Sequence, residues 1–174
     1  RGDLALIWFD AHGDINSPGE SDTHLFYGMP VRVILGDCRA EFPGLCPCCM
    51  QAEQVINVGG RDLDDAEKRY MEKNNIPVIR PQAYDRMEKA LMSAVGKTGK
   101  KHIYIHLDLD VLDPPEFPAV PVPAPGGLKY GDLMRLLEKL KAEYPIAGMG
   151  LYEYKKERSR NQKLEALISF GLDI

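Results

Sequence analysis

Residues 4–14 read LALIWFDAHGD, an unbroken apolar run that ends in three potential metal ligands. A second run, residues 103–110, reads IYIHLDLD and ends in two carboxylates. Apolar runs of this length are typical of strands buried in a parallel sheet. Because side chains two apart on a strand share a face, each run can present two donors in the same direction.

The donors at the two run ends are of the kind that binds a divalent cation. They are Asp10, His12, Asp14, Asp108 and Asp110. Four carboxylates and one imidazole suit a hard or borderline ion such as Mn(II), and burying them without a cation would be prohibitive. If the two strands are neighbours, the set suits two metals that share a carboxylate. The competing interpretation is that the first aspartates cap a turn and the last two are solvated.

Length and composition favour a small-molecule protein with one domain, residues 1–174. The net charge is −4 and the Lys and Arg residues are scattered, which argues against a nucleic-acid partner. No apolar run approaches the roughly 20 residues of a membrane-spanning helix, and no signal sequence opens the chain. We therefore expect a cytoplasmic protein without a membrane partner.

Strand-like and helical segments alternate along the chain. The predicted strands are 4–9, 55–58, 76–79, 103–107 and 146–151. The predicted helices are 65–74, 85–95, 130–143 and 158–170. This alternation predicts an α/β fold with three α/β/α layers around a mainly parallel sheet. Ligands of such sheets bind beyond the carboxyl ends of the strands, where both acidic motifs fall.

Several motifs together resemble one family. They are DAHGD at 10–14, DLDVLDP at 108–114, the Gly-Gly-Leu end of a proline-rich stretch at 126–128, Gly-Met-Pro at 28–30 and GRDLD at 60–64. In this order they resemble the ureohydrolases, the family of arginase, agmatinase and formiminoglutamase. The resemblance covers most of the chain. It implies an arginase-like fold, a small guanidino or amidino substrate and assembly into homo-oligomers.

The resemblance also implies two Mn(II) ions that activate water to hydrolyse a C–N bond of a linear amidine or guanidine. Matched by position, Asp10 and Asp108 would bridge the two ions. His12 and Asp110 would complete one ion's shell, and Asp14 would bind the other. Asp14 would also act in catalysis by accepting the proton of the attacking water.

Three further residues match substrate-binding positions of the family. Glu153 would act in catalysis by orienting the planar cation through paired hydrogen bonds, and its alternative is a surface residue at a strand end. Asn16 and Asp64 match positions that hold the carboxylate and amino group of the substrate in arginases. Asp64 is equally well placed to cap the helix predicted at 65–74.

The sequence departs from the family in three places. The chain opens in mid-domain at Arg1, without the upstream Gly-Gly-Asp-His strand whose histidine is a ligand, so we expect an N-terminally incomplete domain with one weaker ion. Tyr27 stands where arginases relay protons through a histidine, and His24 could substitute. Val122 replaces a hydroxyl-bearing residue. These changes favour an alternative function as a catalytically impaired, ligand-binding or assembly subunit.

Other candidate ligands stay open. His106 shares a strand face with Asp108, so it could orient a ligand carboxylate, bind the metal directly or be a core histidine. Four cysteines lie between residues 38 and 49. Their spacing lacks paired C-x2-C units, so we expect reduced thiols in a loop in preference to a zinc cluster.

Overall fold

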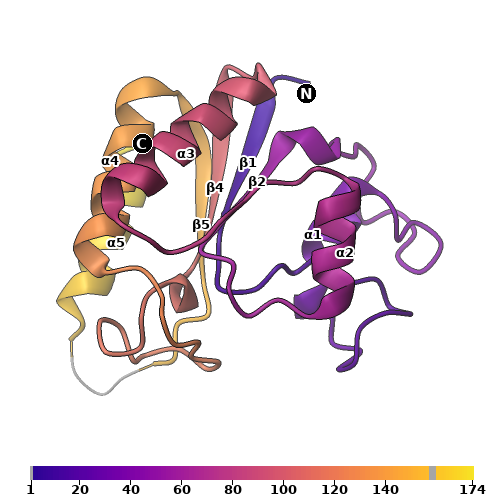
Figure 1. The fold of residues 1–174 in the computed structure, drawn as a ribbon, viewed down its shortest axis with the longest axis horizontal. Coiled ribbons are helices and arrows are strands. Elements are labelled where there is room, and N and C mark those ends of the chain that lie inside the picture. The colour runs from indigo at the N-terminus through magenta and orange to yellow at the C-terminus, as the bar shows by residue number, and fades with distance from the viewer. Residues whose placement is uncertain (1, 157–159) are drawn as a thin grey trace.

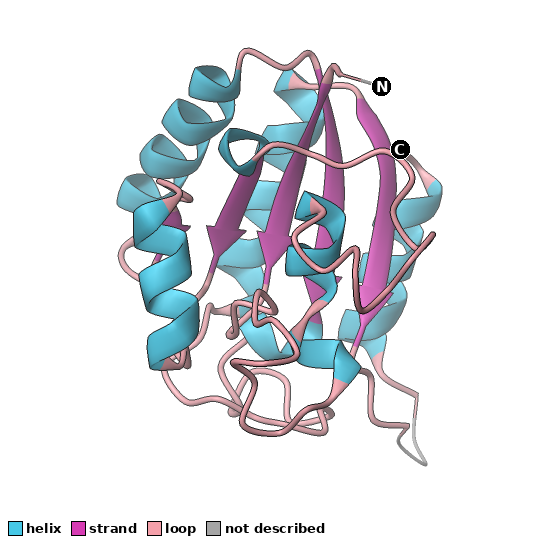
Figure 2. Ribbon diagram, turned by 90° about the vertical axis from the view of Figure 1, so that its right-hand side faces the viewer, coloured by secondary structure: helices cyan, strands magenta, loops and turns pink. Residues whose placement is uncertain are grey.

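The computed structural model describes residues 2–156 and 160–174, which form a five-stranded sheet of order β3-β2-β1-β4-β5. The strands are β1 (Leu4–Phe9), β2 (Val55–Val58), β3 (Val78–Ile79), β4 (His102–Asp108) and β5 (Ile146–Tyr152). All four neighbouring pairs run parallel. In Figure 2 the strand arrows point the same way, and long loops gather beyond their tips.

Helices cover both faces of the sheet, which confirms the predicted three-layer α/β/α architecture (Figure 1). One face carries α1 (Pro30–Leu35) and α2 (Asp65–Lys73), and the other carries α3 (Tyr84–Thr98), α4 (Tyr130–Glu143) and α5 (Gln162–Leu172). Short 3-10 turns lie at Phe26–Gly28, Ala52–Gln54 and Leu109–Val111. Among the described residues, no helix is both long and apolar enough to cross a membrane.

The apolar pattern of each element explains which face it covers. Along β1, Ile7 belongs to the core beneath α3, α4 and α5, while Leu6 belongs to the core beneath α1 and α2. In α4 the leucines recur at helical spacing and are fully buried; they are Leu133, Leu136, Leu137 and Leu140. Strand β1 therefore buries both of its faces, whereas α4 buries a single apolar stripe against the sheet.

The structure differs from the prediction at several element boundaries and contains one helix that was not predicted. The strand predicted at 76–79 is reduced to Val78–Ile79. The helix predicted to begin at residue 158 begins at Gln162, after Asn161 accepts a capping hydrogen bond from Leu164 N at 3.1 Å, and residues 157–159 lie outside the described residues. Helix α1 was not predicted, because six residues are too few to show helical periodicity.

Candidate metal centre

The carboxyl ends of β1 and β4 bring the two acidic motifs together. The strands are direct neighbours, with Trp8 opposite His106, so Asp10 and Asp108 lie at adjacent strand ends. Asp10 is fully buried, Asp108 is 5% exposed and Asp110 is 3% exposed. The interpretation of the last two aspartates as solvated is therefore wrong.

The same carboxylates also shape the backbone that follows each strand. Asp10 Oδ1 accepts a hydrogen bond from His12 N at 2.7 Å, and Asp108 Oδ1 accepts one from Asp110 N at 2.9 Å. Asp110 Oδ1 in turn accepts from Ala11 N at 3.0 Å, which joins the two strand ends. The side chains that stabilise the turns after the strands are therefore the same ones that bring the metal-ligand candidates together.

Asp10, His12 and Asp110 form a first group of possible ligands, with donor atoms all within 4.8 Å of one another. His12 Nδ1 lies 2.9 Å from Asp110 Oδ2 and 3.4 Å from Asp10 Oδ1. Hydrogen bonds to Asp10 and then Asp110 raise the pKa of His12 to about 11. An imidazolium thus lies between two buried carboxylates, where a metal cation would balance the same charge.

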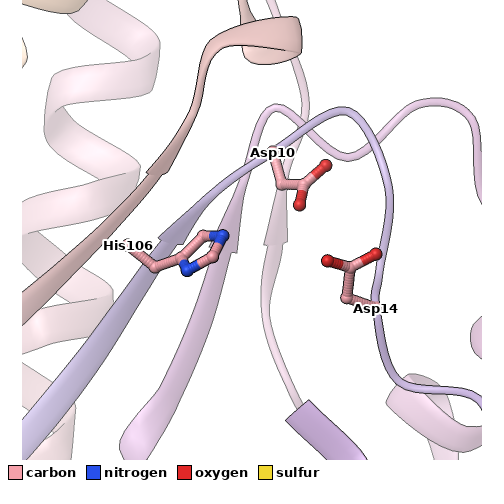
Figure 3. A group of neighbouring side chains, drawn as sticks. All are labelled: Asp10, Asp14 and His106. Carbon is pink, nitrogen blue, oxygen red and sulfur yellow. The ribbon is translucent and has the colours of Figure 1, made fainter. Parts of the chain in front are cut away.

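Asp10, Asp14 and His106 form a second group, whose donor atoms also lie within 4.8 Å of one another. Figure 3 shows the two carboxylates and the imidazole directed toward a common space. Asp14 has a left-handed backbone with φ of 50°, and its carbonyl oxygen accepts a hydrogen bond from Val31 N of α1 at 2.9 Å. Asp10 belongs to both groups, so this one side chain could donate to either site.

Burial and mutual repulsion raise the pKa values of the clustered carboxylic acids. Burial, followed by Asp10 and Asp108, raises the pKa of Asp14 to about 10. Burial, followed by Asp10 and Asp110, raises the pKa of Asp108 to about 9, and burial raises that of Asp10 to about 6. Burial would also raise the pKa of Asp110, but the hydrogen bond from His12 holds it below its usual value.

The donor set fits divalent cations of the Mn(II) type. It combines buried carboxylate oxygens with the imidazoles of His12 and His106, which are ligands for hard and borderline ions. Burial lowers the pKa of His106 to about 3, so its imidazole is neutral at physiological pH. Strongly shifted pKa values gathered at one place are typical of functional sites.

Trp8 supports the centre and was missed by the sequence analysis. Its Nε1 donates a hydrogen bond to Asp10 Oδ2 at 3.0 Å. The ring also stacks on His106, with centroids 3.4 Å apart and planes 4° apart. The signal was available, because Trp8 lies two residues before Asp10 and therefore faces the same side of the strand.

The buried Glu67 and the half-buried Arg61 hold the surrounding loops. Glu67 Oε1 accepts a hydrogen bond from Ile15 N at 3.4 Å, and a Cβ atom on Gly13 would lie only 2.7 Å from the same oxygen. Arg61 donates to the carbonyl oxygens of Asp110 at 2.8 Å and Ala124 at 2.6 Å. The proline-rich segment is thereby tied to the end of β4. Neither role leaves a local pattern in the sequence.

A cavity of about 480 Å³ opens beside the centre. Asp14, His106, Asp108, Glu153 and Tyr27 contribute to its lining. The remaining lining side chains are mostly apolar and include Leu6, Trp8, Ile34, Met50 and Tyr152. An apolar hollow with a few convergent polar groups is typical of a small-molecule site.

The structure separates the other predicted site residues from this cavity. Asn16 and Asp64 do not line it; Asn16 Nδ2 donates to Asp64 Oδ2 at 2.5 Å. Asp64 also accepts a hydrogen bond from Glu67 N at 2.9 Å, which confirms that it caps α2. His24 and Val122 are likewise outside the lining. The substrate-binding roles of Asn16 and Asp64 stay predictions.

The cysteine segment lies apart from the metal centre. Cys38, Cys46, Cys48 and Cys49 lie in the connection between α1 and the turn Ala52–Gln54, and these four residues form no disulfide. Cys46 Sγ and Cys49 Sγ contact backbone carbonyl oxygens of Cys48 and Cys46. Cys46 Sγ also contacts Ile34 O of α1, so this thiol joins the loop to the preceding helix.

The fold and the site define an α/β protein with a carboxylate-rich candidate metal centre at the strand ends. The family model described as "Arginase family" matches residues 1–169, and the chain belongs to this family. It is 31% identical to an arginase of Staphylococcus aureus strain COL over 155 residues, which cover 86% of this chain and 51% of that protein. It is 32% identical to arginase-1 of Sus scrofa over 162 residues, covering 87% and 50%.

Solved structures show the same relationship. The arginase of Bacillus caldovelox superposes with a TM-score of 0.83 at 27% identity, covering 97% of this chain and 60% of that one. The arginase of Bacillus cereus gives a TM-score of 0.82 at 30% identity, covering 98% and 62%. The chain spans about half the length of the curated relatives it matches.

Proposed function

We propose that this chain carries the metal-binding and catalytic part of a manganese-dependent hydrolase that cleaves a C–N bond of a linear guanidino or amidino compound. The observation that carries the proposal is the convergence of donors from β1 and β4 beside a cavity that Glu153 also lines. Membership of the arginase family supports the same chemistry, since the relatives described above are named arginases.

Two divalent cations fit the two groups of donors. One would be held by Asp10, His12 and Asp110, and the other by Asp10 and Asp14, with Asp108 close to both through its interactions with Asp10 and Asp110. When bound, such a pair of cations lowers the pKa of a shared water, which makes a nucleophile available at neutral pH. Because Asp10 is buried and held by Trp8, the shared carboxylate has a fixed position.

The chain's own carboxylates would guide the reaction. Glu153 accepts hydrogen bonds from two N–H groups of the planar substrate cation and so holds the central carbon of the substrate toward the metal centre. Bound cations would favour the ionised form of Asp14. A carboxylate oxygen of Asp14 then takes up the proton of the water that adds to this carbon. The same proton then reaches the leaving nitrogen, and the C–N bond breaks to release an amine. Asp14 and Glu153 both line the same cavity.

The lining of the cavity also suits the rest of such a substrate. Met50, Tyr27 and Tyr152 provide apolar surface beside the acidic groups, which matches an aliphatic chain that carries a cationic head. Asn16 and Asp64 would recognise a remote amino-acid group, although in the structure Asn16 donates a hydrogen bond to Asp64, and Asp64 caps α2. A homo-oligomeric state and a cytoplasmic location stay predictions.

A catalytically impaired, ligand-binding subunit is the second candidate. The observation that favours it is Tyr27, which lines the cavity and is 58% exposed. A phenol is a poorer proton shuttle than an imidazole at neutral pH. In this case substrate and metal would bind, and turnover would be slow or absent.

The decisive experiment is to incubate the purified protein with Mn(II) and measure product release from arginine, agmatine and formiminoglutamate. Turnover that requires Mn(II) would support the hydrolase. Metal binding by calorimetry together with substrate binding but without turnover would support the impaired subunit. Absence of Mn(II) binding would contradict both.

A further inference from the structure

One buried imidazole nitrogen lacks a partner. His106 is 8% exposed, and its Nε2 makes no hydrogen bond among the described residues. Buried polar atoms nearly always have a partner, so an exception calls for an explanation such as a bound ion. The unsatisfied nitrogen indicates that a bound group occupies the adjacent space, either a cation that takes the lone pair of Nε2 or an acceptor of its proton.

The position of the ring favours an ion. Its donor atom lies within 4.8 Å of the donor atoms of Asp10 and Asp14. In Figure 3 the ring nitrogen far from the backbone faces the two carboxylates. One nitrogen and two carboxylate oxygens directed at one point form a donor set for a borderline divalent cation.

Aromatic stacking fixes the ring in this direction. His106 is sandwiched between Trp8, with ring centroids 3.4 Å apart, and Tyr152, with centroids 4.1 Å apart. Trp8 also donates to Asp10, so one side chain positions both the imidazole and the shared carboxylate. Because Nε2 has no hydrogen bond to a carboxylate, it does not act here by orienting one.

We propose that His106 Nε2 is a direct ligand of the divalent cation held by Asp10 and Asp14. The inference rests on the proposed metal centre. It adds to that proposal by assigning a nitrogen ligand on β4 to the ion held by Asp10 and Asp14. The two ions would then each have one imidazole, His12 for one and His106 for the other, with Asp10 between them.

The test is a titration of the purified protein with Mn(II) by calorimetry. His106→Phe removes the nitrogen and keeps a planar ring between Trp8 and Tyr152. This variant should lose at least about tenfold in affinity for one of two ions. The matched control is His102→Phe, on the same strand, where the side chain is 51% exposed and lies against Asp3. The control should bind both ions as the unaltered protein does.

Pulsed electron paramagnetic resonance of bound Mn(II) provides a second measurement, because it detects histidine nitrogens on the ion directly. The unaltered protein should show coupling to two histidines, and His106→Phe should show coupling to one. A cooperative unfolding transition measured in EDTA establishes that a variant is folded. His106→Gln provides a second variant if the phenylalanine side chain does not fit.

The outcomes separate this inference from the proposed function. Unchanged affinity and unchanged nitrogen coupling in His106→Phe would overturn the ligand role of His106. If Asp108→Ala still lost Mn(II) binding in that case, the proposed metal centre would remain supported without His106 as a ligand. If the unaltered protein binds no Mn(II), the metal centre itself fails and the inference fails with it.

Discussion

His12 Nδ1 lies 2.9 Å from Asp110 Oδ2, so the loop after β1 is joined directly to the turn after β4. Asp110 also accepts a hydrogen bond from Ala11 N at 3.0 Å. The imidazolium and a metal ion would compete for the same carboxylates, because His12 must lose its proton to become a ligand. This pair therefore links folding of the two strand ends to metal binding.

Mn(II) should stabilise the folded chain, because a cation that binds only the folded state shifts the equilibrium toward it. At a free concentration 100 times the dissociation constant, the gain is about 2.7 kcal/mol. Asp108→Ala should abolish this gain, and Asp65→Ala, which alters an exposed carboxylate on α2, should retain it. Thermal unfolding with and without Mn(II) measures the effect. An equal rise of the melting temperature in Asp108→Ala would contradict the metal site.

Stability in EDTA should depend on pH through Asp108. Burial and repulsion raise its pKa from 3.8 to about 9, so the folded chain holds this proton more tightly than the unfolded chain. The contribution of Asp108 to the free energy of unfolding is complete below a pH of about 4 and is lost as the pH rises to about 9. Across that window the unaltered chain should lose stability relative to Asp108→Asn, by at most about 1.4 kcal/mol per pH unit. Urea unfolding across this pH range measures the difference, and parallel profiles would refute it.

Glu153→Gln should reduce kcat/KM by about tenfold to a hundredfold, because the neutral amide removes a charge-assisted contact to the substrate cation. Mn(II) affinity should change little, since Glu153 is in neither group of donors. Glu138→Gln on the exposed side of α4 is the matched control. Steady-state kinetics with arginine and agmatine provide the measurement. Equal rates in the variant and the unaltered protein would exclude the role of Glu153.

Tyr27→His should raise kcat at neutral pH if proton relay limits turnover, because an imidazole titrates near neutrality and a phenol does not. The substitution is on the surface of the cavity, so stability should be affected little. Phe26→His, in the adjacent and similarly lining position, controls for a nonspecific effect of a histidine. A rate that stays constant in Tyr27→His would show that this position does not limit the reaction.

Arg61→Lys should destabilise the chain by about 1–3 kcal/mol, because an ammonium cannot reproduce the fork of hydrogen bonds to separate carbonyl oxygens. The proline-rich segment should also become easier to cleave, since Arg61 binds the carbonyl oxygens of Ala124 and Pro125. Arg69→Lys on the exposed side of α2 is the control. Urea unfolding and limited proteolysis test the two effects, and unchanged cleavage would argue against the proposed tie.

Much of the fold was predictable because its signals are local. The apolar run of β1 has the same bounds in the sequence prediction and in the structure, Leu4–Phe9, as does α4, Tyr130–Glu143. Both elements carry a continuous pattern over several residues. Helix α1 was not predicted and β3 was predicted two residues too long, because six residues and two residues contain too little periodicity to fix an element.

The candidate site divides in the same way. The donors Asp10 and Asp110 were predicted from their spacing on the strand ends, and the structure brings them within one group. Trp8 was missed although its partner Asp10 lies only two residues away. Arg61 was missed because its carbonyl partners belong to segments distant in the chain. Asp64 could be read as a cap or as a substrate ligand, and only the bond from Glu67 N established the cap.

The sequence by itself determined which segments are strands and which side chains leave them as donors, because both follow from apolar runs and from the two-residue repeat of a strand. Only the tertiary structure decided that β4 lies beside β1, that His106 is held between Trp8 and Tyr152, and that its Nε2 is left without a partner. The physical reason is that strand order and ring stacking depend on packing between segments far apart in the chain, which no local pattern encodes.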